Sequence, residues 1–219
     1  HVEWLITKNS FAHNPIFKEN NFKLHQFVSS ICVDNLVDER IVDKDYLFSN
    51  LEPVCTAALA HGVNNITIPI LEDSSMEDDE NRAMFCKLML EISKKYPDIN
   101  FCFEAELGHK KLLEILNVSS NFYVTYDTGN MTSYGEDHEI CLNKLSKFIR
   151  NVHLKDRTYD CKTVSPGTGD TNFKLIFQIL KKIGYNGPYT IQTARAKSGE
   201  EVSTILKHKK IFEELYNEK

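Results

Sequence analysis

The sequence predicts a (β/α)8 barrel from which the first βα unit is missing, so that seven strands remain. Short apolar runs rich in β-branched and aromatic residues alternate with longer segments of helical period along all 219 residues. Such alternation is typical of a parallel sheet with helical crossovers, and a complete barrel has about 250 residues and eight strands. Since residues 2–6 already form an extended apolar run, the missing unit is predicted to be the first. We expect a single domain over residues 1–219.

Seven apolar runs carry the strand signal. The runs at 28–33 and 65–70, for example, are rich in Val and Ile, which favour a pleated, half-buried surface. No Gly-x-Gly-x-x-Gly pattern follows any of the seven, which disfavours a dinucleotide-binding fold. The predicted strands cover residues 2–6, 28–33, 65–70, 100–106, 122–127, 151–155 and 189–193.

The segments between the strands place apolar residues at helical spacing. A helical stretch at 45–61 contains Pro53, which is expected to kink or restart the helix. The acidic run at 72–80 is expected to form a loop and a helix N-terminus, where carboxylates complement the helix dipole. Gly184 follows a later helix and is a good helix stop. The faces predicted to be buried are Met84, Phe85, Leu88 and Ile92; Phe173, Ile176, Leu180 and Ile183; and Val202, Ile205, Leu206 and Phe212.

The charge and composition argue against several classes of partner. The formal net charge is −5, which disfavours nucleic acid or an anionic membrane surface. No apolar run approaches the roughly 18 residues that a membrane span needs, and no signal-peptide pattern opens the sequence. The 6 cysteines include no Cys-x-x-Cys pair. We therefore expect free cysteines and a cytoplasmic protein.

Three predicted strands end in side chains that can bind a metal. Glu104, Asp127 and His153 each close an apolar run. Parallel strands present their carboxyl ends at one edge of the sheet, where ligands bind, so these side chains are expected to meet there. Carboxylates and an imidazole suit a divalent ion. Glu106 shares a face with Glu104, but Glu104 directly follows its apolar run and is preferred. The alternative is three unrelated polar residues, with Asp127 as a helix cap.

Four motifs in the C-terminal half occur in an order that resembles a known family. They read Asp-x-Gly-Asn at 127–130, His-x-Lys-Asp at 153–156, Pro-Gly-x-Gly-Asp-x-x-Phe at 166–173 and Gly-Tyr-x-Gly-Pro-Tyr-x-Ile-x at 184–192. In this order they resemble the sugar phosphate isomerase/epimerase family, whose members are xylose isomerase-like TIM barrels related in fold to endonuclease IV. The N-terminal half matches more weakly: residues 2–4 resemble the family's second strand, and residues 28–32 resemble its third.

The resemblance implies one divalent ion held from four strand ends. Matched strand by strand, the ligands are Glu104, Asp127 and His153, and the fourth position, a glutamate in the family, is Gln192. In the family's epimerases the two glutamates also move protons on opposite faces of the substrate. Gln192 can offer its carbonyl oxygen to a metal but cannot take a proton. The resemblance thus implies metal binding, by Mn²⁺, Zn²⁺, Mg²⁺ or Co²⁺, without two-base epimerisation.

Other residues near these strand ends are candidates for substrate contact or catalysis. Lys155 is expected to polarise a carbonyl as an electrophile, with a plain strand-end Lys–Asp pair as the alternative. Gly167 and Gly169 are expected to present backbone N–H groups to a phosphate, or else to form a simple turn. Arg195 would grip a carboxylate or phosphate, or lie on the surface. The remaining candidates for substrate binding are Glu3, Asn130 and Asp156.

The sequence therefore predicts a metal-dependent sugar or sugar-phosphate isomerase or epimerase. Its chemistry would be proton transfer next to a carbonyl, with Glu104 as both ligand and base. One alternative is an altered barrel that binds a sugar or a partner protein without epimerising it, because of Gln192. Another is a metal-dependent lyase or hydrolase. The expected partner is a small sugar, and self-association into a homo-oligomer is expected because a barrel lacking one strand has an unpaired edge.

Overall fold

The computed structural model describes residues 1–18 and 27–218. The chain forms two compact units, residues 1–125 and residues 126–219, which are described in turn. The expectation of one domain stays a prediction. The first unit contains β1 (Val2–Leu5), η1 (Phe11–His13), η2 (Pro15–Phe17), β2 (Val28–Cys32), η4 (Asp34–Leu36), η5 (Glu39–Val42), α1 (Lys44–Ala60), β3 (Asn65–Ile70), η6 (Glu72–Ser74), α2 (Asp79–Lys95), β4 (Asn100–Ala105), α3 (His109–Leu116) and most of β5 (Phe122–Asp127).

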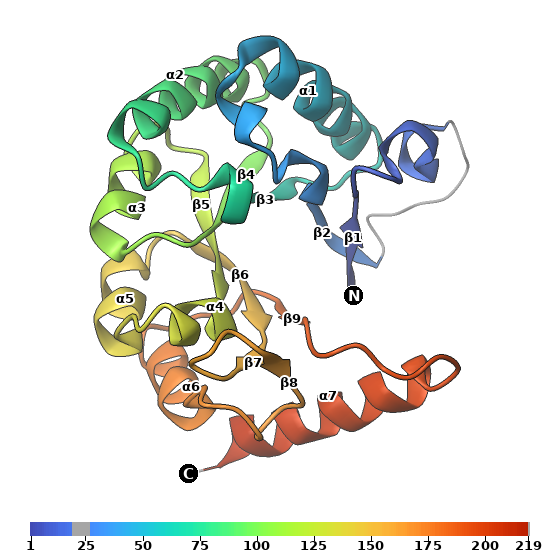
Figure 1. Ribbon diagram of the computed structural model, residues 1–219, viewed down its shortest axis with the longest axis vertical. Coiled ribbons are helices and arrows are strands. Elements are labelled where there is room, and N and C mark those ends of the chain that lie inside the picture. Colours follow the sequence, from blue (N-terminus) through green and yellow to red (C-terminus); the bar gives the residue numbers. More distant parts are fainter. Residues whose placement is uncertain (19–26, 219) are drawn as a thin grey trace. The chain divides into compact units, whose positions relative to one another are not determined.

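The alternation of side chains along β4 explains how the first unit packs. Phe103 meets Phe85 of α2 at a ring-centroid distance of 5.6 Å and Phe122 of β5 at 5.1 Å. This face of the strands is therefore the one that the helices cover, and α1, α2 and α3 lie along it (Figure 1). Thr67 of β3 and Thr125 of β5 share a hydrogen bond of 2.9 Å, so polar side chains collect on the opposite face. Successive residues of a strand alternate between the two faces.

The second unit contains the end of β5 and the C-terminal elements. β6 pairs in parallel with the last strand, whereas the two short strands between them form an antiparallel pair that the sequence did not predict. The last helix packs on the preceding one through Phe173 and Phe212, whose rings lie 5.1 Å apart. The elements are α4 (Thr128–Ser133), α5 (His138–Leu145), β6 (Ile149–Leu154), β7 (Asp156–Arg157), β8 (Thr163–Val164), α6 (Phe173–Lys182), β9 (Tyr189–Ile191) and α7 (Glu201–Asn217).

The seven parallel strands confirm the predicted fold class. Their order in the sheet is β1-β2-β3-β4-β5-β6-β9, so strands that follow one another in sequence are also neighbours. Each predicted strand is present, with ends that differ by no more than two residues. No helix among the described residues has the length and apolar character needed to cross a membrane.

Two predictions about helix faces are wrong, and one of two alternatives for α1 is excluded. α1 does not restart at Pro53, which lies within the helix, and the expected kink stays a prediction. Pro53 and Ser49, whose carbonyl loses its usual partner, are exposed, so water can satisfy that carbonyl. Met84 is 45% exposed, because α2 turns Met89 rather than Met84 toward the strands. In α7 only His208 and Phe212 are buried, and the predicted apolar face at 202–206 is exposed.

Candidate functional site

In the second unit the Asp-x-Gly-Asn motif forms the junction between β5 and α4. Asp127 caps α4, and its Oδ1 accepts a hydrogen bond from the backbone N–H of Asn130 at 2.7 Å. The hydroxyl of Thr128 donates to the carbonyl of Lys155 at 2.7 Å and accepts from the Lys155 N–H at 3.0 Å, which ties the junction to the end of β6. Gly129 is required there, since an added Cβ would lie 2.8 Å from Lys155 Cγ.

This junction brings three of the predicted site residues together. Asp127 Oδ2 lies 2.8 Å from the ammonium of Lys155 and 3.8 Å from Nδ1 of His153. Asp127, His153 and Lys155 are all buried. The Lys155 ammonium also donates to Oδ1 of Asn130 at 3.3 Å. The result is a buried, polar cluster of a carboxylate, an imidazole and a cation at the carboxyl ends of β5 and β6.

A second buried network in this unit supports α4, and no motif of the sequence predicted it. Tyr126 Oη lies 2.7 Å from Nδ1 of His138, and Nε2 of His138 lies 2.9 Å from the hydroxyl of Thr132. Since Thr132 donates its own hydrogen to the carbonyl of Thr128 at 2.8 Å, it accepts from His138, and Nδ1 must accept from Tyr126. The chain of donors thus requires a neutral imidazole, and burial lowers the pKa of His138 to about 4.

The folded protein is expected to lose stability through His138 in mild acid. Its imidazole binds a proton less readily when folded (pKa about 4) than when unfolded (about 6.5), so its contribution is full above pH 6.5 and falls as the pH drops toward 4. The loss should reach about 3 kcal/mol in the free energy of unfolding. Urea denaturation from pH 7 to pH 4.5 should therefore show a steeper decline for the wild type than for His138→Gln. Identical slopes for the two proteins would contradict this assignment.

In the first unit Glu104 is the last residue but one of β4 and is buried. It is one residue after Phe103, whose ring faces the helices, so alternation places the carboxylate on the polar face of the strands. Glu106 lies in the loop beyond β4, where it accepts a hydrogen bond from the backbone of Glu72 at 3.0 Å. Glu104 and Glu106, the two alternatives for the metal ligand in the sequence, thus occupy different environments.

Glu3 belongs to a ladder of hydroxyl groups on the same polar face. Its Oε2 accepts hydrogen bonds from Ser30 of β2 and, at 3.0 Å, from Thr67 of β3. Thr67 in turn is bonded to Thr125. These bonds give Glu3 a role in joining strands, and its predicted contact with a sugar hydroxyl stays a prediction.

Asp34 is a residue of this unit that the sequence analysis missed. It begins η4, with one residue between it and the end of β2, and directly follows the strand predicted at 28–33. Partial burial, and then the nearby negative charge of Glu104, raise the pKa of Asp34 above its ordinary value. Its position immediately after a strand was the signal that would have identified it.

The remaining predicted contacts lie in two places, the loop that follows β8 and the segment beyond β9. Both oxygens of the buried Asp156 accept backbone N–H groups, from Thr168 at 3.0 Å, Gly169 at 2.9 Å and Thr171 at 3.3 Å. The amide of Gly169 is therefore already engaged, and a phosphate would have to displace Asp156. Gly167 is exposed, at a φ of 79°. Gln192 and Arg195 are also exposed, beyond the end of β9. The roles of all these residues stay predictions.

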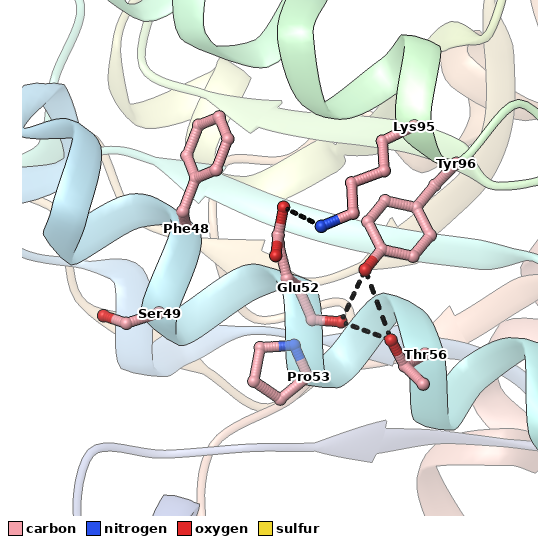
Figure 2. Close-up of a pocket in the computed structure, with 7 residues that line it drawn as sticks. All are labelled: Phe48, Ser49, Glu52, Pro53, Thr56, Lys95 and Tyr96. Atoms are coloured by element: carbon pink, nitrogen blue, oxygen red, sulfur yellow. Dashed lines mark hydrogen bonds and ion pairs between the residues drawn. The ribbon is translucent and has the colours of Figure 1, made fainter.

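The first unit also has a shallow hollow of about 470 Å³ (Figure 2). It is lined by α1 and by Tyr96, which follows α2 and precedes the start of β4. Glu52 and Lys95 form an ion pair of 2.7 Å across it, and the hydroxyls of Tyr96 and Thr56 lie 3.2 Å apart. These groups are engaged with one another. The hollow is at the amino end of β4, opposite the edge where a βα fold binds its ligands.

Parallel strands with buried carboxylate and imidazole groups at their carboxyl ends place this chain among the βα-barrel proteins. The xylose isomerase-like TIM barrel family matches residues 42–213. The chain belongs to this family.

Relatives and solved structures agree with that membership. An inosose dehydratase of Clostridium tetani is 35% identical over 95 residues, 35% of this chain and 32% of the relative. An uncharacterized protein of Methanocaldococcus jannaschii is 31% identical over 115 residues, 50% of this chain and 38% of the relative. The matched segments thus span about a third of the length of these relatives. The structure of a D-tagatose 3-epimerase-like protein shares the fold, with a TM-score of 0.74 at 19% identity over 97% of this chain and 87% of that one.

Proposed function

We propose that this chain is a carbohydrate-modifying enzyme, a metal-dependent isomerase or epimerase of a sugar or sugar phosphate. The observation that carries the proposal is the buried cluster of Asp127, His153 and Lys155 at the ends of β5 and β6. Ionisable groups withdrawn from water are costly, and they concentrate at functional sites. The similarity to an inosose dehydratase supports a polyhydroxylated ketone as the substrate class.

Glu104 is proposed to join Asp127 and His153 as a ligand. β4 and β5 pair with Phe103 opposite Val124, so the next pair along is Glu104 with Thr125. Asp127 lies two residues beyond Thr125 on β5, and residues two apart share a face. Two carboxylates and an imidazole are a donor set that suits Mn²⁺, Zn²⁺, Mg²⁺ or Co²⁺.

The side chains of the chain itself would perform the proton transfer. A divalent ion held by these ligands would stabilise negative charge on the substrate oxygens. Glu104 would take the proton from the hydroxyl-bearing carbon next to the carbonyl and deliver it to the former carbonyl carbon, while the hydroxyl proton passes to the former carbonyl oxygen. Lys155 would donate a hydrogen bond to the oxygen on which charge develops, and Asn130 would orient its ammonium (3.3 Å).

A dehydratase is the second candidate. The proton would again leave the carbon next to a carbonyl, and a hydroxyl on the next carbon would then depart as water. Such a reaction needs no second carboxylate on the opposite face of the substrate. Gln192 stands at the strand end where the family has its second glutamate, and the similarity to an inosose dehydratase points the same way.

Gln192→Glu tests the proposal. The added negative ligand is expected to raise Mn²⁺ affinity by roughly tenfold or more, because ligand charge tunes metal affinity, and to raise any epimerase activity. Calorimetric titration with Mn²⁺ would be combined with turnover assays on ketose phosphates, aldose phosphates and inososes, with and without Mn²⁺. If the variant binds Mn²⁺ no better and neither form converts any of these substrates, the enzyme proposal fails. A sugar-binding or partner-binding protein would then take its place.

A further inference from the structure

Arg157 is a half-buried cation in the second unit, and among the described residues the hydrogen-bond partners of its side chain are neutral. Its Nη1 donates to the hydroxyl of Ser133 at 3.3 Å, and its Nε donates to the hydroxyl of Thr163 at 3.4 Å. Both distances lie at the long end of the range for hydrogen bonds. Within residues 1–18 and 27–218, no carboxylate forms an ion pair with it. A cation drawn partly out of water without an opposite charge is unfavourable, so this guanidinium is suited to an anion.

The position of Arg157 places it beside the proposed reaction centre. Asn130 and Ser133 are three residues apart on α4 and lie on one face of that helix. Asn130 contacts the ammonium of Lys155, and Ser133 contacts the guanidinium of Arg157. Lys155 and Arg157 are thus two successive cations along the same face of α4, about one helical turn apart.

The two cations differ in whether a carboxylate neutralises them. Lys155 is neutralised by Asp127 at 2.8 Å. Asp156, which stands between the two cations in sequence, has its oxygens engaged by three backbone N–H groups of the loop 168–171. Those bonds direct its carboxylate toward the loop. They also occupy the amides that a phosphate would otherwise use, which leaves Arg157 as the better anion site in this unit.

We propose that Arg157 binds an oxyanion of the substrate, a phosphate ester or a carboxylate, next to the carbon that reacts. The planar fork of a guanidinium matches two oxygens of such a group. The inference rests on the proposed function and makes it more specific: the substrate is an anionic sugar rather than a neutral one. Ser133 and Thr163 would hold the guanidinium in place while it binds.

Titration calorimetry of the purified protein with inorganic phosphate, and separately with acetate, tests this site. Arg157→Gln is expected to weaken the binding of the anion roughly 10–100-fold, the range for hydrogen bonds to charged groups. Arg157→Lys keeps the positive charge but loses the planar fork of the guanidinium. Its affinity for the anion should therefore lie between those of the wild type and Arg157→Gln. Arg150→Gln removes an exposed arginine at the start of β6 and serves as the matched control. Binding of phosphate alone identifies a phosphate ester, and binding of acetate alone identifies a carboxylate.

Mn²⁺ titration of the same proteins separates this inference from the proposed function. Arg157→Gln should bind Mn²⁺ as the wild type does, since Arg157 is not among the proposed ligands. If the wild type binds neither anion, or if Arg157→Gln and Arg157→Lys both bind as the wild type does, the assignment of Arg157 is overturned whatever the metal result. If Mn²⁺ fails to bind while the anion binds through Arg157, the proposed metal site fails and the anion site stands.

Discussion

Asp127→Asn is expected to reduce Mn²⁺ affinity and turnover by more than about 100-fold. Removing a group one shell beyond a metal ligand already costs roughly 10–100-fold, and Asp127 is a proposed ligand. The same change leaves the buried ammonium of Lys155 without its ion-pair partner at 2.8 Å, which should lower the free energy of unfolding by about 3–5 kcal/mol. Titration calorimetry, steady-state kinetics and urea denaturation would measure the three effects.

The chain offers a matched control for this variant. Asp137 caps α5 as Asp127 caps α4, accepting the backbone N–H of Ile140 at 2.9 Å, but Asp137 is exposed. Asp137→Asn should change stability by less than about 1 kcal/mol and should leave metal binding unaltered. A double variant, Asp127→Asn with Lys155→Met, removes both buried charges and should regain stability without regaining Mn²⁺ affinity. Equal losses of metal binding in the Asp127 and Asp137 single variants would refute the assignment.

Glu104→Gln is expected to lower turnover by about 10²–10⁴-fold, the usual contribution of a general base. Glutamine keeps the shape of the side chain and can still offer an oxygen, so Mn²⁺ affinity should fall by a smaller factor than turnover. The change also removes a negative charge that raises the pKa of Asp34. The pKa of Asp34 should therefore move down in the variant, and carbon-detected NMR titration of the aspartate carboxyls would measure it.

Glu106→Gln is the control for Glu104. It lies two residues further on, outside β4, and bonds to the backbone of Glu72. Glu106→Gln should retain turnover within about threefold of the wild type, because surface changes away from a site usually cost little. A larger loss of turnover in Glu106→Gln than in Glu104→Gln would transfer the catalytic role to Glu106.

The local sequence pattern was sufficient to predict the strands and the order of the site residues along the chain. Period-2 alternation and apolar runs identified all seven parallel strands, and strand ends that carry Asp127 and His153 indicated the cluster. The sequence pattern did not predict burial correctly where a side chain packs against residues distant in the sequence. Met84 fits the apolar stripe of α2 as well as Met89 does, and only the packing of α2 decides which is buried. Likewise α7 has an apolar stripe at 202–206 that the described residues leave exposed.

The sequence by itself determined which residue types stand at the strand ends, since side-chain period and strand length are local properties. Only the tertiary structure decided how those residues are used. Asp156 accepts hydrogen bonds from three amides that follow it by 12 to 15 residues, which nothing in its motif indicated. His138 belongs to none of the sequence motifs, yet it bonds to both Tyr126 and Thr132 and so supports α4. A hydrogen-bond partner is chosen by distance in space, which no spacing along the chain specifies.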